Sequence, residues 1–317
     1  MSRVRLKPEG MNRIFPRIFK SLVMAALAVA VPSTATQART PAPTRSGEQL
    51  LKGCGGRDGW SDPAPPAHIY GNTWYVGTCG ITAILATSDE GHVLIDSGPA
   101  DAAPLVLANV RKLGFDPKDV RWILSSHEHH DHIGSVAALQ RETGAQVAAL
   151  ASAQRAMESG VPSADDPQAK VIGGSPPVKV SRVLADGDSL TLGRLAFTVR
   201  QTPAHSPGSA SWSWQSCDAA FTCRMIAYAD SATTVSADDY RFTDHPDRIA
   251  QVRTGLARIA ELPCDILVTP HPSASNFFER LAGKAPLVDA SACSAYARSA
   301  ATRFDERLAS EAKATSR

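Results

Sequence analysis

One short run of the chain, His127 to His132, constrains the protein more than any other feature of its sequence. The run reads H-x-H-x-D-H and directly follows an apolar, strand-like stretch over residues 120–124. Imidazole and carboxylate groups are the ligands that suit borderline cations such as zinc. Because alternate residues of an extended segment point to the same side, we expect His127 and His129 to hold one ion together. The turn that follows would direct Asp131 and His132 at a second, adjacent ion.

Two three-ligand sites need further ligands, and two other histidines are well placed to supply them. His205 lies in a loop rich in Pro and Gly, and His271 follows a buried-looking strand at a turn bracketed by prolines. Functional groups are commonly carried on loops at the ends of strands. We therefore expect His205 and His271 to complete the sites. The other candidates, His68, His92 and His245, lie in strand-like or helix-start patterns and are expected to be structural.

A surface cluster of histidines is the simpler interpretation of the run. Such clusters do not lie between an apolar strand and a helical pattern, however, and here a helix is expected over residues 134–143. Glu128 and His130 occupy the x positions of the run. We expect their side chains to point away from the metal ions.

These features are similar to those of metallo-β-lactamase-fold hydrolases, and more narrowly to those of subclass B3 metallo-β-lactamases. The resemblance rests on the run over residues 127–132, on His-Ser-Pro-Gly at 205–208, on Ala-Asp-Ser at 229–231 and on Pro-His-Pro at 270–272. It covers residues 60–305 or so. The run alone is typical of the superfamily, whereas its combination with the later motifs is typical of the subclass.

The resemblance implies a secreted hydrolase with two zinc ions, each held by three ligands. The first set is His127, His129 and His205, and the second set is Asp131, His132 and His271. A hydroxide held by the metal ions, with Asp131 as the catalytic residue that orients it, would open the β-lactam ring of antibiotics and confer resistance to them. Ser231 and Thr233 would hydrogen-bond the carboxylate of the substrate. We also expect residues 157–168 to form a loop over the site.

The fold is expected to be one large α/β domain over residues 52–317. Strand patterns followed by helix patterns occur in two similar halves, which favours two facing sheets with helices outside. The resemblance implies the same fold, an αββα sandwich of two facing mixed sheets with outer helices. A strand is expected over residues 178–184. Residues 39–51, rich in Pro, Thr and Ser, are expected to be an exposed leader.

Residues 1–38 have the pattern of a secretory signal peptide. Basic residues precede an apolar stretch over residues 22–31, and small residues follow it. This stretch is too short to cross a membrane as a helix, and Met11 begins a more typical signal than Met1 does. We therefore expect a periplasmic mature chain, monomeric and without a membrane anchor, that acts on a small-molecule β-lactam.

The charge of the mature chain excludes an obvious polyanionic partner. The signal segment contains six of the 33 basic residues and one of the 31 acidic residues, so 27 basic and 30 acidic residues remain. A nearly neutral chain with scattered charges has no electrostatic footprint for nucleic acid or for an anionic membrane. The mildly basic character of the whole chain therefore comes from its first residues.

Six cysteines in an exported chain indicate disulfide bonds. Six cysteines allow fifteen pairings, and the family resemblance together with proximity in the sequence favours one of them. In it, Cys264 pairs with Cys293 as in subclass B3 enzymes. Cys217 and Cys223 flank a short hairpin-like loop and pair with each other, which leaves Cys54 for Cys79.

Two other functions stay open. One is another two-metal hydrolase of the same fold, a lactonase or a thioesterase of the glyoxalase II kind, in which Asp230 would bridge the metals. Secretion argues against it, because such thioesters are largely intracellular. The other is a non-catalytic metal-binding protein. Asp230 and Ser231 face opposite ways if both lie on a strand, so we expect only one of them to enter the site.

Overall fold

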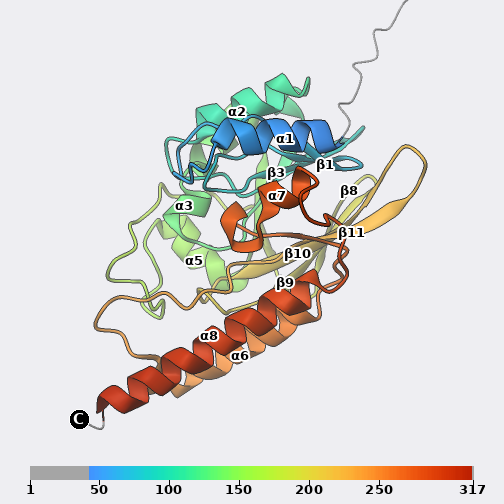
Figure 1. Cartoon of the computed structure of the whole chain (residues 1–317). Helices are drawn as coiled ribbons and strands as arrows, with labels where there is room; N and C mark the ends of the chain where they lie inside the picture. The colour runs from blue at the N-terminus through green and yellow to red at the C-terminus, as the bar shows by residue number, and fades with distance from the viewer. Residues whose placement is uncertain (1–42, 316–317) are drawn as a thin grey trace, which may run out of the picture. The chain divides into compact units, whose positions relative to one another are not determined.

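The structure is a computed structural model that describes residues 43–315 (Figure 1). The predicted signal segment, residues 1–38, lies outside the described residues. Within residues 43–315, no helix is both long and apolar enough to cross a membrane.

Seven strands form the first sheet, in the order β1-β2-β3-β4-β5-β6-β7. The pairs from β1 to β4 are antiparallel and the pairs from β4 to β7 are parallel. Parallel neighbours need crossover connections, and their carboxyl ends therefore meet at one edge of the sheet. The strands are β1 (Ala67–Tyr70), β2 (Thr73–Tyr75), β3 (Ile84–Ser88), β4 (Gly91–Ile95), β5 (Val120–Leu124), β6 (Gln146–Leu150) and β7 (Arg182–Leu184).

Five strands form the second sheet, in the order β12-β11-β10-β9-β8. The pairs from β8 to β11 are antiparallel, and β12 joins β11 in parallel. Both sheets are therefore mixed, as predicted. The strands are β8 (Ser189–Leu192), β9 (Leu195–Gln201), β10 (Ala210–Cys217), β11 (Cys223–Tyr228) and β12 (Ile266–Val268).

Side chains of both sheets meet in one buried apolar cluster. Trp212 and Trp214 alternate along β10 and are both almost completely buried in this cluster, which also contains Ile84 and Leu124 of the first sheet. The indole N–H of Trp212 donates a hydrogen bond to the carbonyl of Ser125 (2.9 Å), directly after β5. The core between the sheets thus holds the start of the segment that carries the metal run.

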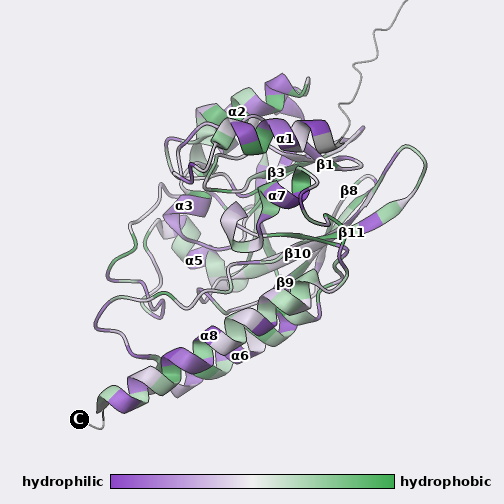
Figure 2. Cartoon of the chain, viewed as in Figure 1, coloured by the Kyte–Doolittle hydropathy of each residue, from purple (hydrophilic) through white to green (hydrophobic). Residues whose placement is uncertain are grey.

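Helices cover the outer faces of the sheets (Figure 1), as an αββα sandwich requires. Helices α2, α4 and α5 share an apolar cluster with β3 to β6, and α6 and α8 share another with β11 and β12. Figure 2 shows that α1, α2 and α8 alternate hydrophilic and hydrophobic residues, as helices with one face against the core do. The helices are α1 (Pro43–Cys54), α2 (Ala103–Lys112), α3 (His130–Ile133), α4 (Val136–Thr143), α5 (Ala151–Ser159), α6 (Pro246–Ala260), α7 (Phe277–Leu281) and α8 (Ala292–Thr315), with the 3₁₀ helices η1 (Pro117–Asp119), η2 (Phe242–Asp244) and η3 (Pro272–Ser275).

Helix α1 differs from the exposed leader expected over residues 39–51. Leu50 is completely buried in the core, and the hydroxyl of Ser46 accepts a hydrogen bond (3.0 Å) from a backbone N–H of β1. A Cβ atom on Gly47 would lie 2.1 Å from the carbonyl oxygen of Leu281 in α7, so the two helices touch at a residue without a side chain. The small residues that resemble a leader in composition allow this close contact, and the expectation of exposure is wrong for α1.

Two other boundaries also differ from expectation. The helix predicted over residues 134–143 begins at Val136, because the turn before it already belongs to the separate helix α3. The strand predicted over residues 178–184 is regular only in β7, although the backbone N–H of Val178 donates to Met157 and that of Ser181 to Val147. Neither difference moves a predicted ligand.

Three disulfide bonds join the chain, and they are the three predicted pairs. Cys54 at the end of α1 pairs with Cys79, Cys217 pairs with Cys223 across the β10–β11 hairpin, and Cys264 pairs with Cys293 at the start of α8. Among the described residues no cysteine is free. The first and third bonds therefore fasten the end of α1 and the start of α8 to segments next to strands, and the second closes the β10–β11 hairpin on itself.

The loops closed by these bonds differ in length, and so should their contributions to stability. The Cys264–Cys293 bond spans 29 residues and the Cys217–Cys223 bond spans 6. Loop-closure entropy predicts a loss of about 3.6 kcal/mol in the free energy of unfolding for a paired Cys→Ser replacement of the first, and about 2.2 kcal/mol for the second. Denaturant unfolding of both double variants measures this. A larger loss for the hairpin pair would contradict the entropic account.

Candidate metal centre

The segment after β5 brings four predicted ligands into one place. His127 lies in the loop that follows β5, and His129 has the extended backbone (φ −77°, ψ 150°) of the residue that precedes α3. The single turn of α3 then brings Asp131 and His132 within reach of His127. The strand, extended segment and turn expected from the sequence are all present.

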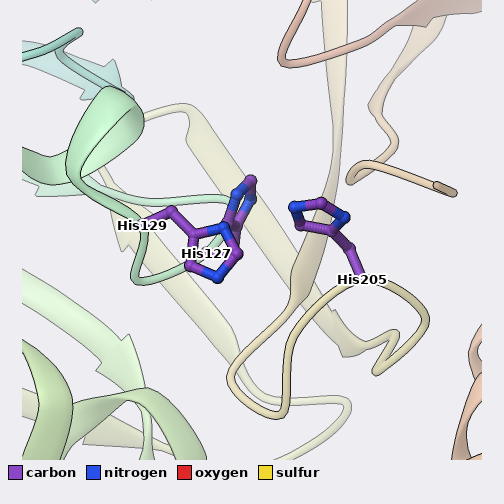
Figure 3. Close-up of side chains that lie close together, drawn as sticks. All are labelled: His127, His129 and His205. Carbon is purple, nitrogen blue, oxygen red and sulfur yellow. The ribbon is translucent and has the colours of Figure 1, made fainter. Parts of the chain in front are cut away.

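His205 joins His127 and His129 from the loop between β9 and β10 of the second sheet. The three imidazoles gather between the two segments that carry them (Figure 3), and one nitrogen of each lies within 4.8 Å of the others. Their ring centroids are 4.6–4.9 Å apart. The structure therefore brings together the three residues predicted for the first ion.

Asp131 and His132 form a second group of ligand atoms within 4.8 Å, and the third member of this group is His127 rather than His271. His271 lies beside it, after β12. Its Nε2 atom is 3.4 Å from Oδ2 of Asp131, and its ring centroid is 5.1 Å from that of His132. The side chain of His271 is 31% exposed, whereas Asp131 and His132 are buried. His271 therefore borders the second group from its more open side.

Each buried imidazole has one ring nitrogen held by a group outside the cluster. The pairs, with their N···O distances, are His127 Nδ1 with Asp230 (2.9 Å), His129 Nε2 with Asp166 (2.7 Å), His132 Nδ1 with Asp96 (3.0 Å) and His205 Nδ1 with the carbonyl of Thr233 (2.9 Å). A hydrogen bond at one nitrogen fixes the tautomer of an imidazole and turns its other nitrogen toward a metal ion. All four rings are therefore oriented in advance.

The protonation state of two members of the first set, His127 and His205, also suits a metal ion. Burial and the neighbouring histidines hold the pKa of His127 well below its usual range, and burial lowers the pKa of His205 to about 3. Both rings are neutral at pH 7, the form that binds metal. The Nε2 atom of His127 is buried and has no hydrogen-bond partner among the described residues. A metal ion would satisfy it.

Asp131 and His132 are held as a charged pair. Oδ2 of Asp131 lies 3.1 Å from Nε2 of His132. Burial alone would raise the pKa of the Asp131 carboxyl, but the contact with His132 outweighs it and lowers that pKa. Burial likewise opposes charge on His132, yet Asp131 and Asp96 raise its pKa to about 10. The two ligand atoms share a proton that metal binding would release.

Asp230 and Ser231 follow β11, and Asp230 lies behind His127. The Asp230 carboxyl is completely buried, which raises its pKa well above the usual range. Neither ligand group found among the described residues includes Asp230. Ser231 is buried, and the exposed Thr233 contacts His205 through its hydroxyl (3.0 Å) as well as its carbonyl. Asp230 is thus placed to orient a ligand.

Two buried residues at the centre come from the segment expected over the site. Asp166, the partner of His129, follows α5 in the chain, and Nε2 of Gln168 lies 3.3 Å from Nε2 of His205. Residues 157–159 of that segment belong to α5 instead. The sequence favoured a loop over the site here but did not single out these two side chains, because nothing in a polar loop distinguishes a buried acid or amide from an exposed one.

The x positions of the run and the remaining histidines have other contacts. Glu128 points to the loop of His205, and the ring centroid of His130 is 5.7 Å from that of the half-exposed Trp60. His68 and His92 pack against Trp74 and Phe115, and His245 stacks on Tyr240. None of these five belongs to a ligand group in the described part of the chain.

Known proteins are similar to this chain in both sequence and fold. A profile of the metallo-beta-lactamase superfamily matches residues 76–271. The metallo-β-lactamase MIM-1 from Novosphingobium pentaromativorans is 76% identical, with 84% of this chain and 98% of that chain covered and a TM-score of 0.83. MEM-A1, a subclass B3 metallo-beta-lactamase isolated from a soil metagenome library, is 38% identical, with 80% and 99% covered and a TM-score of 0.77.

A more distant likeness extends to thioester hydrolases. A hydroxyacylglutathione hydrolase of Anaeromyxobacter dehalogenans (strain 2CP-C) is 32% identical over 139 residues, which are 44% of this chain and 44% of that protein. The chain spans about half the length of the curated relatives that it matches. The solved structures, by contrast, are covered almost completely. The chain therefore belongs to the metallo-β-lactamase superfamily, as an enzyme that groups with its subclass B3 members.

Proposed function

We propose that this enzyme is a secreted zinc hydrolase that opens the β-lactam ring of antibiotics and so confers resistance to them. The observation that carries the proposal is the set of outer hydrogen bonds, which orient the four buried imidazoles through one ring nitrogen each, while Nε2 of His127 stays buried without a partner among the described residues. The names of the similar structures support β-lactams as the small-molecule substrate class.

Two zinc ions suit the donor groups of the centre. The first would be held by His127, His129 and His205, and the second by Asp131, His132 and His271. Bound zinc lowers the pKa of water to about 7 and so supplies a nucleophile at neutral pH. The Asp131 carboxylate, in contact with both His132 and His271, would orient that water toward the lactam carbonyl.

Ser231 and Thr233 would hold the carboxylate of the substrate. Both follow β11: Ser231 is next to Asp230, the residue that orients His127, and Thr233 lies two residues further on. Thr233 is exposed and contacts His205, so its hydroxyl could reach a substrate that lies over the first metal set. The part of a β-lactam that carries the charge would then be fixed while the ring faces the metal ions.

We propose that the enzyme is located in the periplasm and is a monomer. Three disulfide bonds favour an oxidising compartment, and the sequence pattern of residues 1–38 supports export. The nearly neutral mature chain gives no reason to expect nucleic acid or an anionic membrane as a partner.

The likeness to a hydroxyacylglutathione hydrolase keeps a thioesterase or lactonase as the second candidate. That alternative requires Asp230 to bridge two metal ions. Two observations argue against it: Oδ1 of Asp230 is 2.9 Å from Nδ1 of His127, and neither ligand group found among the described residues includes Asp230. β-Lactam hydrolysis therefore remains the preferred function.

The substrate class can be tested directly. We expect the purified mature protein to hydrolyse a chromogenic cephalosporin, to lose that activity with a chelator and to regain it when zinc is added. An acyl-glutathione thioester serves as the competing substrate under the same conditions. Faster turnover of the thioester than of the cephalosporin would contradict the β-lactamase proposal and favour the thioesterase.

The second metal set can be tested through its most exposed member. His271→Ala is expected to reduce the metal content from about two ions to about one per chain, because Asp131 and His132 alone make a weak site. Elemental analysis of dialysed protein measures this, with His245→Ala as a matched control outside the centre. Unchanged metal content and turnover in His271→Ala would remove His271 from the site.

Ser231 can be tested through substrate binding. Ser231→Ala is expected to keep both ions and to lower β-lactam kcat/KM by about ten- to a hundredfold, because a hydrogen bond to a charged group contributes about 1.5–3 kcal/mol. Asp230→Asn should instead weaken metal binding, since Asp230 orients His127. A silent Ser231→Ala variant would show that the substrate carboxylate is bound elsewhere.

A further inference from the structure

The side chain of Glu128 connects two segments that supply metal ligands. Glu128 lies between His127 and His129 in the chain, but its buried carboxylate (5% exposed) points to the loop that carries His205. One carboxylate oxygen accepts a hydrogen bond from the hydroxyl of Ser206 (2.7 Å) and the other from the backbone N–H of Gly208 (3.0 Å). A buried carboxylate is costly unless it is hydrogen-bonded, so these contacts have a strong reason to persist.

A buried cation holds the other side of the same loop. Arg248 in α6 is also 5% exposed, and its guanidinium donates hydrogen bonds to the carbonyls of Pro203 (2.7 Å) and Ala204 (3.1 Å). These carbonyls directly precede His205, whereas the groups bound by Glu128 directly follow it. The loop is therefore held on both sides of His205. Its carbonyls before His205 accept hydrogen bonds from Arg248, and its N–H and O–H groups after His205 donate to Glu128.

The loop has little room to shift between these two groups. A Cβ atom on Gly208 would lie 2.3 Å from a carboxylate oxygen of Glu128. On the opposite side, a Cβ atom on Gly255 of α6 would lie 2.6 Å from the backbone nitrogen of Ala204. Glycine at both points of contact allows α6 and Glu128 to approach the loop closely, and the packing resists movement in either direction.

We infer that Glu128 and Arg248 are positioning residues that fix the backbone of the His205 loop and thereby set the metal affinity of the three-histidine set. This inference rests on the proposed role of His205 as a metal ligand. Thr233 orients the ring of His205, whereas Glu128 and Arg248 fix the position of the backbone from which that side chain extends. Because Glu128 is flanked by the other two ligands, one short segment supplies two imidazoles and also positions the third.

The affinity of the first set can be measured alone in a His271→Ala background, where the second set is expected to be empty. In that background, Glu128→Ala and Arg248→Met should each raise the Kd for zinc by about ten- to a hundredfold, the usual effect of removing a group that supports a ligand. Competition with a chelator of known affinity gives the Kd. Glu128→Gln keeps the shape and one acceptor oxygen and should restore part of the lost affinity.

A matched control is Glu311→Ala. The Glu311 carboxylate also accepts a backbone N–H from another segment (Thr243, 2.9 Å) and contacts Arg307, but its described partners lie outside the His205 loop. This variant should lower stability without changing the Kd for zinc. A general loss of stability is thereby separated from the loss of a positioned ligand.

A second readout needs no metal. In the metal-free protein, Glu128→Ala should speed hydrogen exchange at the backbone N–H of Gly208, which has lost its acceptor, while Glu311→Ala leaves that exchange unchanged. Gly208→Ala, whose new methyl group would displace the Glu128 carboxylate, should weaken zinc binding in the same way. It replaces Glu128→Ala if that variant does not fold.

The outcomes separate this inference from the proposed function. If His205→Ala fails to release an ion, the assignment of the metal set is wrong. If His205→Ala releases an ion but the Kd for zinc is unchanged in a Glu128 or Arg248 variant, the positioning role is overturned for that residue while the metal assignment stands. A raised Kd together with faster exchange at Gly208 supports the inference.

Discussion

The buried carboxylate of Asp96 is the junction on which the geometry of the metal centre depends. It accepts hydrogen bonds from the backbone N–H and the hydroxyl of Ser126 (both 2.6 Å) and from the hydroxyl of Tyr228 (2.7 Å), and it faces Nδ1 of His132. Ser126 follows β5 of the first sheet, Tyr228 ends β11 of the second sheet, and His132 belongs to α3. The side chain of Asp96 therefore joins both sheets to a predicted ligand. Asp96 also has a φ of 59°, a left-handed backbone that costs about 1–3 kcal/mol and persists only where its surroundings hold it.

Much of the site follows from the sequence because its predicted ligands are local or lie at the ends of strands. The spacing in His127, His129 and Asp131 reflects the geometry of an extended segment and a turn, and such geometry is readable without a structure. The groups that orient the ligands are different. Asp166 contacts His129 and Glu128 contacts Ser206 across long separations in the chain, and composition does not distinguish such a buried acid from an exposed one.

The fold shows the same division. Apolar runs predicted the central strands and apolar residues at helical spacing predicted the outer helices, since each element buries apolar side chains at a period of its own. Helix α1 was not predicted, because its contact with α7 depends on Gly47. A position that must lack a side chain leaves no apolar pattern in the sequence. The exact ends of α3 and α4 likewise depend on tertiary contacts, such as the hydrogen bond from the backbone N–H of Ser97 to the carbonyl of His132.

The predicted ligands are widely separated along the chain, and this separation links metal supply to the lifetime of the protein. An unfolded chain keeps residues 127–132 together but holds His205 and His271 at a distance, so it offers only a fragment of either set. Metal ions held by these sets would therefore bind the native state in strong preference and shift the folding equilibrium toward it as their free concentration rises. A shortage of metal would then remove the activity and would also raise the unfolded fraction, which proteases can degrade.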